Sequence, residues 1–253
     1  MDLAARLSQQ NISTSVIIPA RNEALNLQYV LPHIPAFVTE VILVDGHSSD
    51  GTVAVAQQLR PDMRIIEQVG RGKGDAIRVG LAAATGDIVV LLDADGSADP
   101  LEIPRFVTTL LAGNDFAKGS RFLKGGGSHD ITLFRRAGNY GFVSLVNLLF
   151  GARFTDLCYG YNAFWRRCVE YIEIDSDGFE IETLINMRMH LAGLTIAEVP
   201  SVEYQRIHGL SNLNAIKDGW RILMLIFQER KKVKLQAIHP AIRERAVSKE
   251  LVL

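Results

Sequence analysis

Several features that define special classes of protein are scarce in this sequence. Its 253 residues include two cysteines, Cys158 and Cys168, too few for a disulfide framework or a four-cysteine zinc site. We expect both to be free thiols, buried in a protein of a reducing compartment. The longest unbroken apolar run, 222–227, is far shorter than the ~20 residues of a membrane-spanning helix.

An excess of charge of one sign is also missing. The 27 Lys and Arg residues are balanced by 28 Asp and Glu residues, which leaves a formal net charge of −1. A chain without a basic excess is poorly suited to polyanions, so we expect no nucleic-acid partner. The first ten residues lack the basic start and apolar stretch of a signal peptide, which predicts a cytoplasmic protein.

What remains is an ordinary globular composition, with 48% hydrophobic and 22% charged residues. In the first half, short apolar runs alternate with segments of helical spacing. The predicted strands are 15–18, 40–44, 64–66 and 87–92, and the predicted helices between them are 23–31, 50–59 and 75–84. This alternation predicts βαβ units and a parallel sheet.

The second half is less regular. Helices are predicted at 100–112, 135–149 and 216–231, an edge strand at 117–121, and a loop at 124–128. The last helix carries apolar residues near one face and is followed by a cluster of basic residues, Arg230, Lys231, Lys232 and Lys234. Such a helix can pack in the core, or it can lie on an anionic membrane surface.

Polar or glycine-rich sequence follows each of the four predicted strands, at 19–23, 45–50, 70–75 and 93–96. In open parallel sheets, ligands bind beyond the carboxyl ends of the strands. We therefore expect these four segments to converge on one site.

Asp93 and Asp95 are the sharpest signal among them. Carboxylates two residues apart in an extended segment project the same way, and they repel each other unless a cation lies between them. Hard divalent cations take oxygen ligands and often combine one or two carboxylates with substrate phosphates. The pair predicts Mg²⁺ or Mn²⁺ bound to a diphosphate, with a solvated turn as the alternative.

The glycines at 70, 72 and 74 stand before a predicted helix. They can present backbone N–H groups to an anion, or they can serve only a tight turn. Their spacing matches neither the dinucleotide-binding fingerprint nor the Walker pattern.

Four motifs, 17–23, 44–52, 72–74 and 92–96, stand in the order seen in family 2 glycosyltransferases. The chain resembles a member of this family with the GT-A fold over 13–215, followed by an amphipathic helix and basic tail at 216–253. The resemblance implies a Rossmann-like, mostly parallel central sheet flanked by helices, in a single domain with a C-terminal helical extension. It also implies a nucleotide-sugar donor, a divalent cation, and inversion through one direct displacement.

The resemblance assigns roles to residues of the donor site. Those implied to line the nucleotide-sugar pocket are Pro19, Arg21, Glu23, Asp45, Lys73, Gly74 and Asp93. Asp45 is implied to meet the base or ribose. The implied metal ligands are Asp93 and Asp95, which also count among the candidate catalytic residues.

The second half resembles the polyprenol-phosphate hexosyltransferases of the dolichol-phosphate mannose synthase type. The resemblance is carried by 119–126, 156–161 and 206–213, with Asn212 standing where the group has lysine. Arginine binds phosphate through a planar fork of donors. The residues implied to bind an acceptor phosphate are Arg121, Arg135, Arg136 and Arg206.

The acceptor decides whether a base is needed. A phosphate monoester is already anionic, whereas an alcohol needs a positioned base. The candidates are Asp156, Glu180 and Glu182, whose alternative role is that of acidic residues favoured at a helix N-terminus.

We therefore expect a hexosyltransferase that uses a donor of the GDP-mannose or UDP-glucose type and a polyprenyl phosphate. It would work at the inner face of the cell membrane through a peripheral contact. A hydroxyl on a soluble metabolite or glycan is the alternative acceptor. Two further alternatives are a non-catalytic nucleotide-sugar binding module and a sugar-1-phosphate nucleotidyltransferase.

Overall fold

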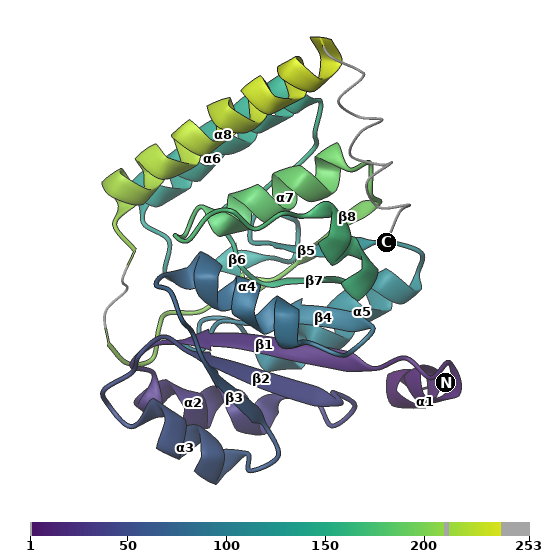
Figure 1. Cartoon of the computed structure of the whole chain (residues 1–253), viewed down its shortest axis with the longest axis vertical. Coiled ribbons are helices and arrows are strands. Elements are labelled where there is room, and N and C mark those ends of the chain that lie inside the picture. The colour runs from purple at the N-terminus through teal and green to yellow at the C-terminus, as the bar shows by residue number, and fades with distance from the viewer. Residues whose placement is uncertain (1, 210–212, 239–253) are drawn as a thin grey trace.

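A seven-stranded sheet forms the centre of the computed structural model, which describes residues 2–209 and 213–238 (Figure 1). The strand order is β3-β2-β1-β4-β7-β5-β8. The bounds are β1 Thr14–Ala20, β2 Glu40–Asp45, β3 Arg64–Glu67, β4 Ile88–Leu91, β5 Phe116–Ser120, β7 Asn162–Trp165 and β8 Ile196–Pro200. Neighbouring strands pair in parallel, except that β7 runs antiparallel to both β4 and β5. Two short strands, β6 Gly127–Ser128 and β9 Val202–Glu203, pair separately.

Helices cover both faces of this sheet. The α-helices are α1 Leu3–Gln9, α2 Ala24–Val30, α3 Thr52–Leu59, α4 Lys73–Ala83, α5 Ile103–Leu111, α6 Leu133–Phe150, α7 Ile181–Leu191 and α8 Ala215–Ile238. Short 3-10 helices are η1 Leu31–His33, η2 Pro100–Glu102 and η3 Arg166–Tyr171. Helices α2, α3 and α5 share a core with one face, and α4 and α7 share a core with the other. The predicted mostly parallel sheet flanked by helices, with a C-terminal helix, is confirmed.

The apolar runs of the strands follow from this coverage. In β1, Val16 and Ile18 belong to the core under α2 and α5, whereas Ile17 belongs to the core under α4 and α7. All three side chains are fully buried. A strand that is covered on both faces reads as a continuous hydrophobic run, which is why the sequence pattern located the first four strands.

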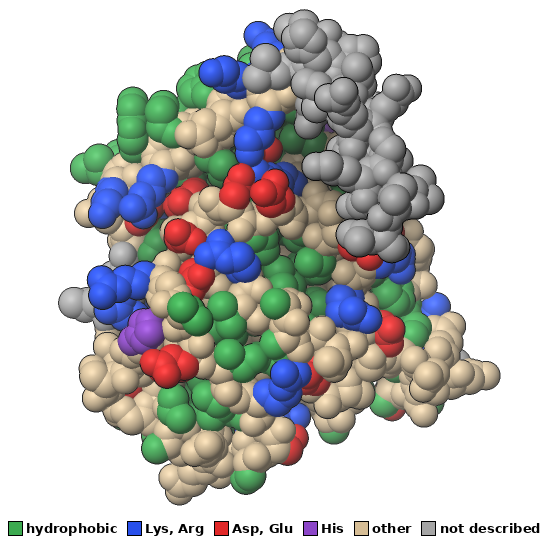
Figure 2. Space-filling model, in the orientation of Figure 1, with side chains coloured by type: hydrophobic (Ala, Val, Ile, Leu, Met, Phe, Trp, Pro, Cys, Tyr) green, Lys and Arg blue, Asp and Glu red, His purple; other side chains and the backbone are tan. Residues whose placement is uncertain are grey.

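Helices α6 and α8 lie side by side at one end of the molecule (Figure 1). Val143 and Val146 of α6 form a core cluster with Ile222 and Ile226 of α8. The outer sides of the two helices remain apolar, and Figure 2 shows hydrophobic side chains gathered there at the upper left, next to Lys and Arg. Helix α8 thus contributes one face to a core and leaves apolar side chains on another.

The expected edge strand at 117–121 is wrong. Strand β5 lies inside the sheet, between β7 and β8, and all five of its residues are buried. Its sequence has no β-branched residue and contains Lys118, which is fully buried. The Lys118 ammonium donates to the carbonyl oxygen of Gly119 (2.8 Å) and lies 3.7 Å from a carboxylate oxygen of Glu198. Because the acidic partner is eighty residues away in sequence, the local pattern could not indicate burial.

The structure also bears on the expectations about membrane-spanning helices and cysteines. No helix within 2–209 and 213–238 is long and apolar enough to cross a membrane. Both cysteines are free thiols, and Cys168 is buried while Cys158 is partly buried. The tail beyond residue 238 and Asn212 lie outside the described residues.

The packing of α4 on the sheet requires glycine at position 80. A Cβ there would meet the Cγ2 of Ile17 at 2.4 Å and that of Val44 at 3.2 Å. We expect Gly80→Ala to lower the free energy of unfolding by about 1–3 kcal/mol, because overpacking outweighs the better helix propensity of alanine. Gly141→Ala in α6 is the matched control, since a Cβ there has no neighbour within 4 Å. Urea denaturation should show the control unchanged or stabilised, and equal behaviour of the two variants would contradict this account.

Candidate functional site

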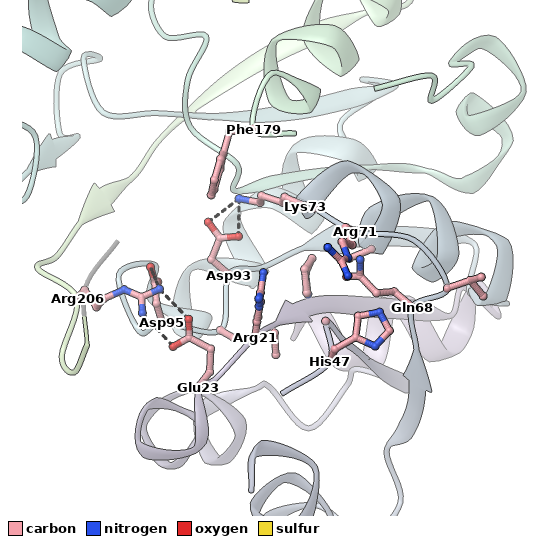
Figure 3. A pocket seen from close by; sticks show the side chains of 17 residues that line it. Arg21, Glu23, His47, Gln68, Arg71, Lys73, Asp93, Asp95, Phe179 and Arg206 are labelled. Carbon is pink, nitrogen blue, oxygen red and sulfur yellow. Dashed lines mark hydrogen bonds and ion pairs between the residues drawn. The ribbon is translucent and has the colours of Figure 1, made fainter. Parts of the chain in front are cut away.

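A cavity of about 850 Å³ lies beyond the carboxyl ends of β1, β2, β3 and β4 (Figure 3). Residues at or just after the end of each of these strands line its wall, as the rule for open parallel sheets requires. The predicted donor-site residues that line it are Pro19, Arg21, Glu23, Lys73, Asp93 and Asp95. The four polar segments therefore do converge on one place.

Two predicted donor-site residues, Asp45 and Gly74, do not line this cavity. Asp45 ends β2 and is buried; one carboxylate oxygen accepts a hydrogen bond from the backbone N–H of Ser48 (3.1 Å), and the other is buried without a partner. Gly74 lies in the first turn of α4 and donates its N–H to the carbonyl of Asp177 (2.9 Å). Contacts of these two residues with a nucleotide stay predictions.

The glycine-rich turn before α4 is crowded by other parts of the chain. A Cβ on Gly72 would meet the carbonyl oxygen of Asp177 at 2.1 Å, and one on Gly74 would meet that of Ser176 at 2.0 Å. A Cβ on Gly70 would lie 2.7 Å from the carboxylate of Asp75. Close approach of the 176–177 backbone thus accounts for two of the three glycines, which favours the packing role over an anion cradle.

Lys73 joins two carboxylates at the edge of the cavity. Its ammonium lies 2.7 Å from Asp93, a contact seen in Figure 3, and 2.6 Å from Glu182, so it bridges the segment after β4 and the first turn of α7. Burial lowers the pKa of Lys73, but the two carboxylates outweigh it and raise the pKa above its ordinary value. Burial raises the pKa of Glu182, and Lys73 opposes that rise. Lys73 therefore carries its charge in this site.

Arg206 forms a second bridge on the other side of the cavity. Its guanidinium donates to both oxygens of Glu23 (2.7 and 3.3 Å) and lies 3.5 Å from Asp95. Burial raises the pKa of Glu23, which Asn26 and Arg206 counteract. Arg206, predicted to bind an acceptor phosphate, thus lies in the same cavity as the predicted donor residues.

The donor set at Asp93 and Asp95 fits a hard divalent cation. Both residues offer only carboxylate oxygens, the ligand type that Mg²⁺ and Mn²⁺ take. In the described part of the chain, no group of three or more His, Cys, Asp and Glu residues is arranged to hold a metal. Two protein carboxylates leave most coordination positions to water and substrate, as is usual for a cation that accompanies a phosphate.

A second cavity, of about 450 Å³, lies between α6 and α8 and is mostly apolar. Phe179 lines both cavities, and Glu182 lines the second while it binds Lys73 in the first. The two cavities therefore adjoin at Phe179 and the Lys73–Glu182 pair. The predicted acceptor residues Arg121 and Arg135 line the second cavity.

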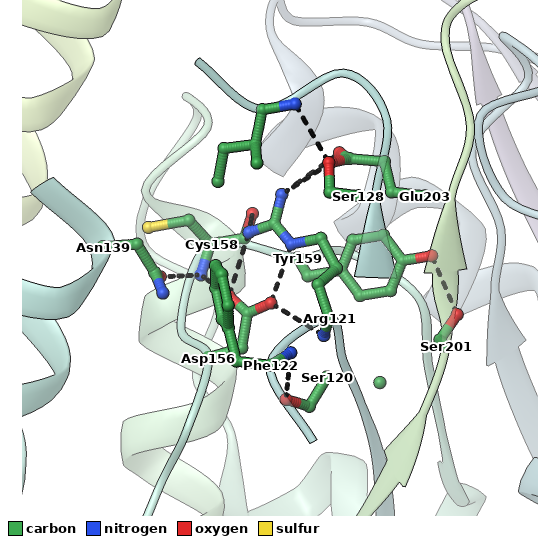
Figure 4. A network of polar contacts seen from close by, with 12 residues as sticks. Ser120, Arg121, Phe122, Ser128, Asn139, Asp156, Cys158, Tyr159, Ser201 and Glu203 are labelled. Carbon is green, nitrogen blue, oxygen red and sulfur yellow. Dashed lines mark hydrogen bonds and ion pairs between the residues drawn. The ribbon is translucent and has the colours of Figure 1, made fainter. Parts of the chain in front are cut away.

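Arg121 is the centre of a buried ion-pair network (Figure 4). Its guanidinium binds both oxygens of Asp156 (2.8 and 2.9 Å), Glu203 (3.0 Å) and the carbonyl of Cys158 (3.0 Å). Burial raises the pKa of Asp156, but the charge and hydrogen bonds of Arg121, together with the charge of Lys118, outweigh burial, so the net pKa lies below the ordinary value. Because Asp156 is fully buried in this pair, the described structure presents neither of its oxygens to a cavity.

The remaining predicted acceptor and base residues differ in how strongly other protein groups bind them. Arg135 lies 3.1 Å from Asp130 and is only a quarter exposed, whereas Arg136 is exposed and stacks over the ring of Phe122. Glu180 accepts hydrogen bonds from the Ser176 hydroxyl (2.5 Å) and the N–H of Gly178. With Glu182 bound to Lys73, each of the three candidate bases is engaged by the protein.

Sequence reasoning missed four residues of the cavity walls, Gln68, Val69, Ala76 and Phe179. Gln68 follows β3 directly, so the rule that located the other segments also applied to it. Phe179 precedes α7 in an irregular segment and carries no pattern that points to a site.

A family model described as Glycosyl transferase family 2 matches residues 15–172. The chain belongs to this family. The resemblance drawn from the four ordered motifs is thereby confirmed, and the protein is a glycosyltransferase.

Two relatives at about 30% identity have names that match the polyprenol-phosphate group which the second half resembles. A dolichyl-phosphate hexose transferase of Haloferax volcanii is 31% identical over 209 residues, which cover 81% of this chain and 88% of the relative. A polyprenol monophosphomannose synthase of Mycolicibacterium smegmatis is 31% identical over 219 residues, which cover 79% and 81%. Among solved structures, glucosyl-3-phosphoglycerate synthase from Mycobacterium tuberculosis with Mn²⁺ and UDP-glucose matches with a TM-score of 0.68 and 25% identity, covering 90% of this chain and 81% of that one.

The Arg121–Asp156 pair should be essential for stability. Asp156→Asn removes a buried charge from its partner, and we expect a loss of about 3 kcal/mol, near the lower end for broken buried pairs because Glu203 still binds Arg121. Since the folded-state pKa of Asp156 is lowered, the pair stabilises the fold above the ordinary aspartate pKa and loses this effect as the pH falls below it.

The measurement is chemical denaturation of both proteins at pH 7 and at about pH 3.5, a value just below the ordinary aspartate pKa. The difference between wild type and Asp156→Asn should narrow at the lower pH. Arg105→Ala, which removes an exposed partner of Glu102, is the control and should change stability by less than ~0.5 kcal/mol. A loss at Asp156 no larger than that of the control would contradict the assignment.

Proposed function

We propose that this glycosyltransferase moves a hexose from a GDP- or UDP-hexose to a polyprenyl phosphate, with inversion at the anomeric carbon. The donor would occupy the larger cavity, with Mg²⁺ or Mn²⁺ at Asp93 and Asp95. The acceptor phosphate would lie at the mouth of the smaller cavity. Residues 13–215 would form the catalytic domain, and 216–253 its C-terminal helix and basic tail.

The observation that carries this proposal is the junction of two unlike cavities. The larger one lies at the strand ends and has a mixed lining that includes many charged side chains, while the smaller one lies between α6 and α8 and is mostly apolar. A nucleotide sugar suits the first and an isoprenoid chain suits the second. Because they adjoin at Phe179 and the Lys73–Glu182 pair, the reacting groups of two such substrates can meet there.

Free cationic groups in the larger cavity suit a diphosphate. Within the described residues, Arg21 and Arg71 line this cavity and take part in no hydrogen bond or ion pair with the protein. A guanidinium binds phosphate oxygens through two parallel hydrogen bonds. A divalent cation, when bound, would neutralise the charge that develops on the leaving nucleoside diphosphate. The solved relative with Mn²⁺ and UDP-glucose supports this donor class.

The engagement of all three candidate bases by other protein groups supports a phosphate acceptor, which needs no base. In the displacement, an acceptor phosphate oxygen forms a bond to the anomeric carbon while the bond to the diphosphate oxygen breaks. An anionic phosphate gives up no proton in this step, so no base is required. Asp156, Glu180 and Glu182 are all held by other protein groups. Arg135 lines the second cavity and pairs there with the partly exposed Asp130, a partner that an acceptor phosphate would replace.

The outer faces of α6 and α8 suit contact with an anionic membrane. Leu133 and Leu148 on α6 and Ile216 and Trp220 on α8 are each more than 60% exposed. Ile216 and Trp220 also line the second cavity, so an isoprenoid chain could continue from it into a bilayer. Basic residues near the end of α8, including Lys231 and Lys234, would face the lipid headgroups of the inner leaflet.

Removal of either metal-binding carboxylate should abolish transfer. We expect Asp93→Asn and Asp95→Asn to lower Mn²⁺-dependent transfer at least ~100-fold while the fold is retained. The assay follows radiolabel from UDP- and GDP-hexoses into a chloroform-extractable product in the presence of a short polyprenyl phosphate. Full activity of either variant would refute its assigned role, and label that stays aqueous with every lipid would favour a soluble hydroxyl acceptor.

Arg135 should determine acceptor affinity without affecting the donor. We expect Arg135→Met to raise the KM for polyprenyl phosphate about 10–100-fold, the effect of losing one charge-assisted hydrogen bond. Slow hydrolysis of the donor without acceptor should stay at the wild-type rate. Arg167→Met is the control, because Arg167 is exposed, pairs with Asp115 and lines neither cavity. Equal changes in both variants would exclude a specific role for Arg135.

A further inference from the structure

Each carboxylate of the Asp93–Asp95 pair is held by a cation that also binds a second carboxylate. Lys73 lies 2.7 Å from Asp93 and 2.6 Å from Glu182. Arg206 lies 3.5 Å from Asp95 and 2.7 Å from Glu23. The two bridges are built alike, and Figure 3 shows Lys73 at Asp93 and Arg206 beside Glu23 and Asp95 at separate places in the cavity.

A divalent cation and the ammonium of Lys73 would compete for Asp93. Lys73 contacts both oxygens of this carboxylate, at 2.7 and 2.9 Å, so it binds the same atoms that a metal would need. Two positive groups at contact distance in a half-buried site repel each other strongly. The ammonium must therefore give up at least part of its contact with Asp93 when a cation binds.

Glu182 supplies the alternative partner. Its carboxylate is about a tenth exposed and contacts Lys73 at 2.6 Å, so Lys73 can leave Asp93 without becoming an unpaired buried charge. The lysine side chain has four flexible carbons and three donors, which suits a short displacement toward Glu182. Arg206 is less close to Asp95 than Lys73 is to Asp93, so Lys73 is the stronger competitor of the two.

We propose that Lys73 holds the place of the divalent cation on Asp93 in the ligand-free enzyme, and that Glu182 retains Lys73 when the cation binds. The inference rests on the proposed metal site at Asp93 and Asp95. Glu182 is accordingly a positioning residue, since it acts on the metal site through Lys73.

The test measures Mn²⁺ binding without donor, by the electron paramagnetic resonance signal of free Mn²⁺. It compares wild type with Lys73→Met, Glu182→Gln and the double variant. The double variant is decisive, because it removes one positive and one negative charge and so keeps the net charge of the site. We expect it to bind Mn²⁺ about tenfold more tightly than wild type, because the competitor of the cation is gone.

The single variants test the part played by Glu182. Glu182→Gln should weaken Mn²⁺ binding about tenfold in the wild-type background, since Lys73 then has only Asp93. In the Lys73→Met background the same substitution should have a clearly smaller effect. Equal effects in both backgrounds would show that Glu182 does not act through Lys73, and would overturn its role.

The remaining outcomes separate this inference from the proposed function. If wild type binds Mn²⁺, Asp93→Asn abolishes binding, and the double variant binds like wild type or more weakly, the placeholder role is wrong while the metal site stands. If no protein binds Mn²⁺ and Asp93→Asn has no effect, the metal site is wrong and the inference falls with it. Circular dichroism and thermal unfolding identify variants with a native fold, and the double variant leaves no unpaired charge of the Lys73–Glu182 pair.

Discussion

The ion pairs of Lys73 with Asp93 and Glu182 connect the two halves of the protein. Lys73 begins α4 and Asp93 follows β4, both in the regular first half, whereas Glu182 begins α7 in the second. Without the ammonium, two carboxylates would face each other in a half-buried place, where like charges repel strongly. The wall between the two cavities depends on this compensation, and so does the distance between any donor and acceptor bound in them.

The sequence predicted the first half well because burial on both faces leaves a local trace. Strands such as β1 and β4 read as unbroken apolar runs, and the segments after them are polar, so both the sheet and the position of the larger cavity could be inferred. The second half leaves no such trace. Lys118 and Arg121 are buried there because each forms an ion pair, Lys118 with Glu198 and Arg121 with Asp156. A local sequence pattern cannot indicate pairs between residues so far apart in the chain.

The glycine-rich turn shows the same limit at a single motif. Its spacing is compatible with an anion cradle, but Gly72 and Gly74 make room for the backbone of 176–177, about one hundred residues further along. A tight turn and a ligand-binding turn both need glycine, so composition cannot separate them. Only the position of the 176–177 segment distinguishes the two roles, and that position is set by tertiary packing.

The charges of Lys73, Asp93 and Glu182 also affect the order in which cation, donor and acceptor bind. With Lys73 shared between two carboxylates, the region next to the second cavity keeps excess negative charge, which disfavours an anionic acceptor. On the placeholder proposal, occupation of Asp93 by a cation moves Lys73 fully to Glu182 and neutralises that carboxylate. The phosphate of the acceptor would then meet a neutral pair and Arg135 instead of an unbalanced carboxylate. The same lysine would thereby favour binding of cation and donor before the acceptor, through electrostatics alone and without a moving domain.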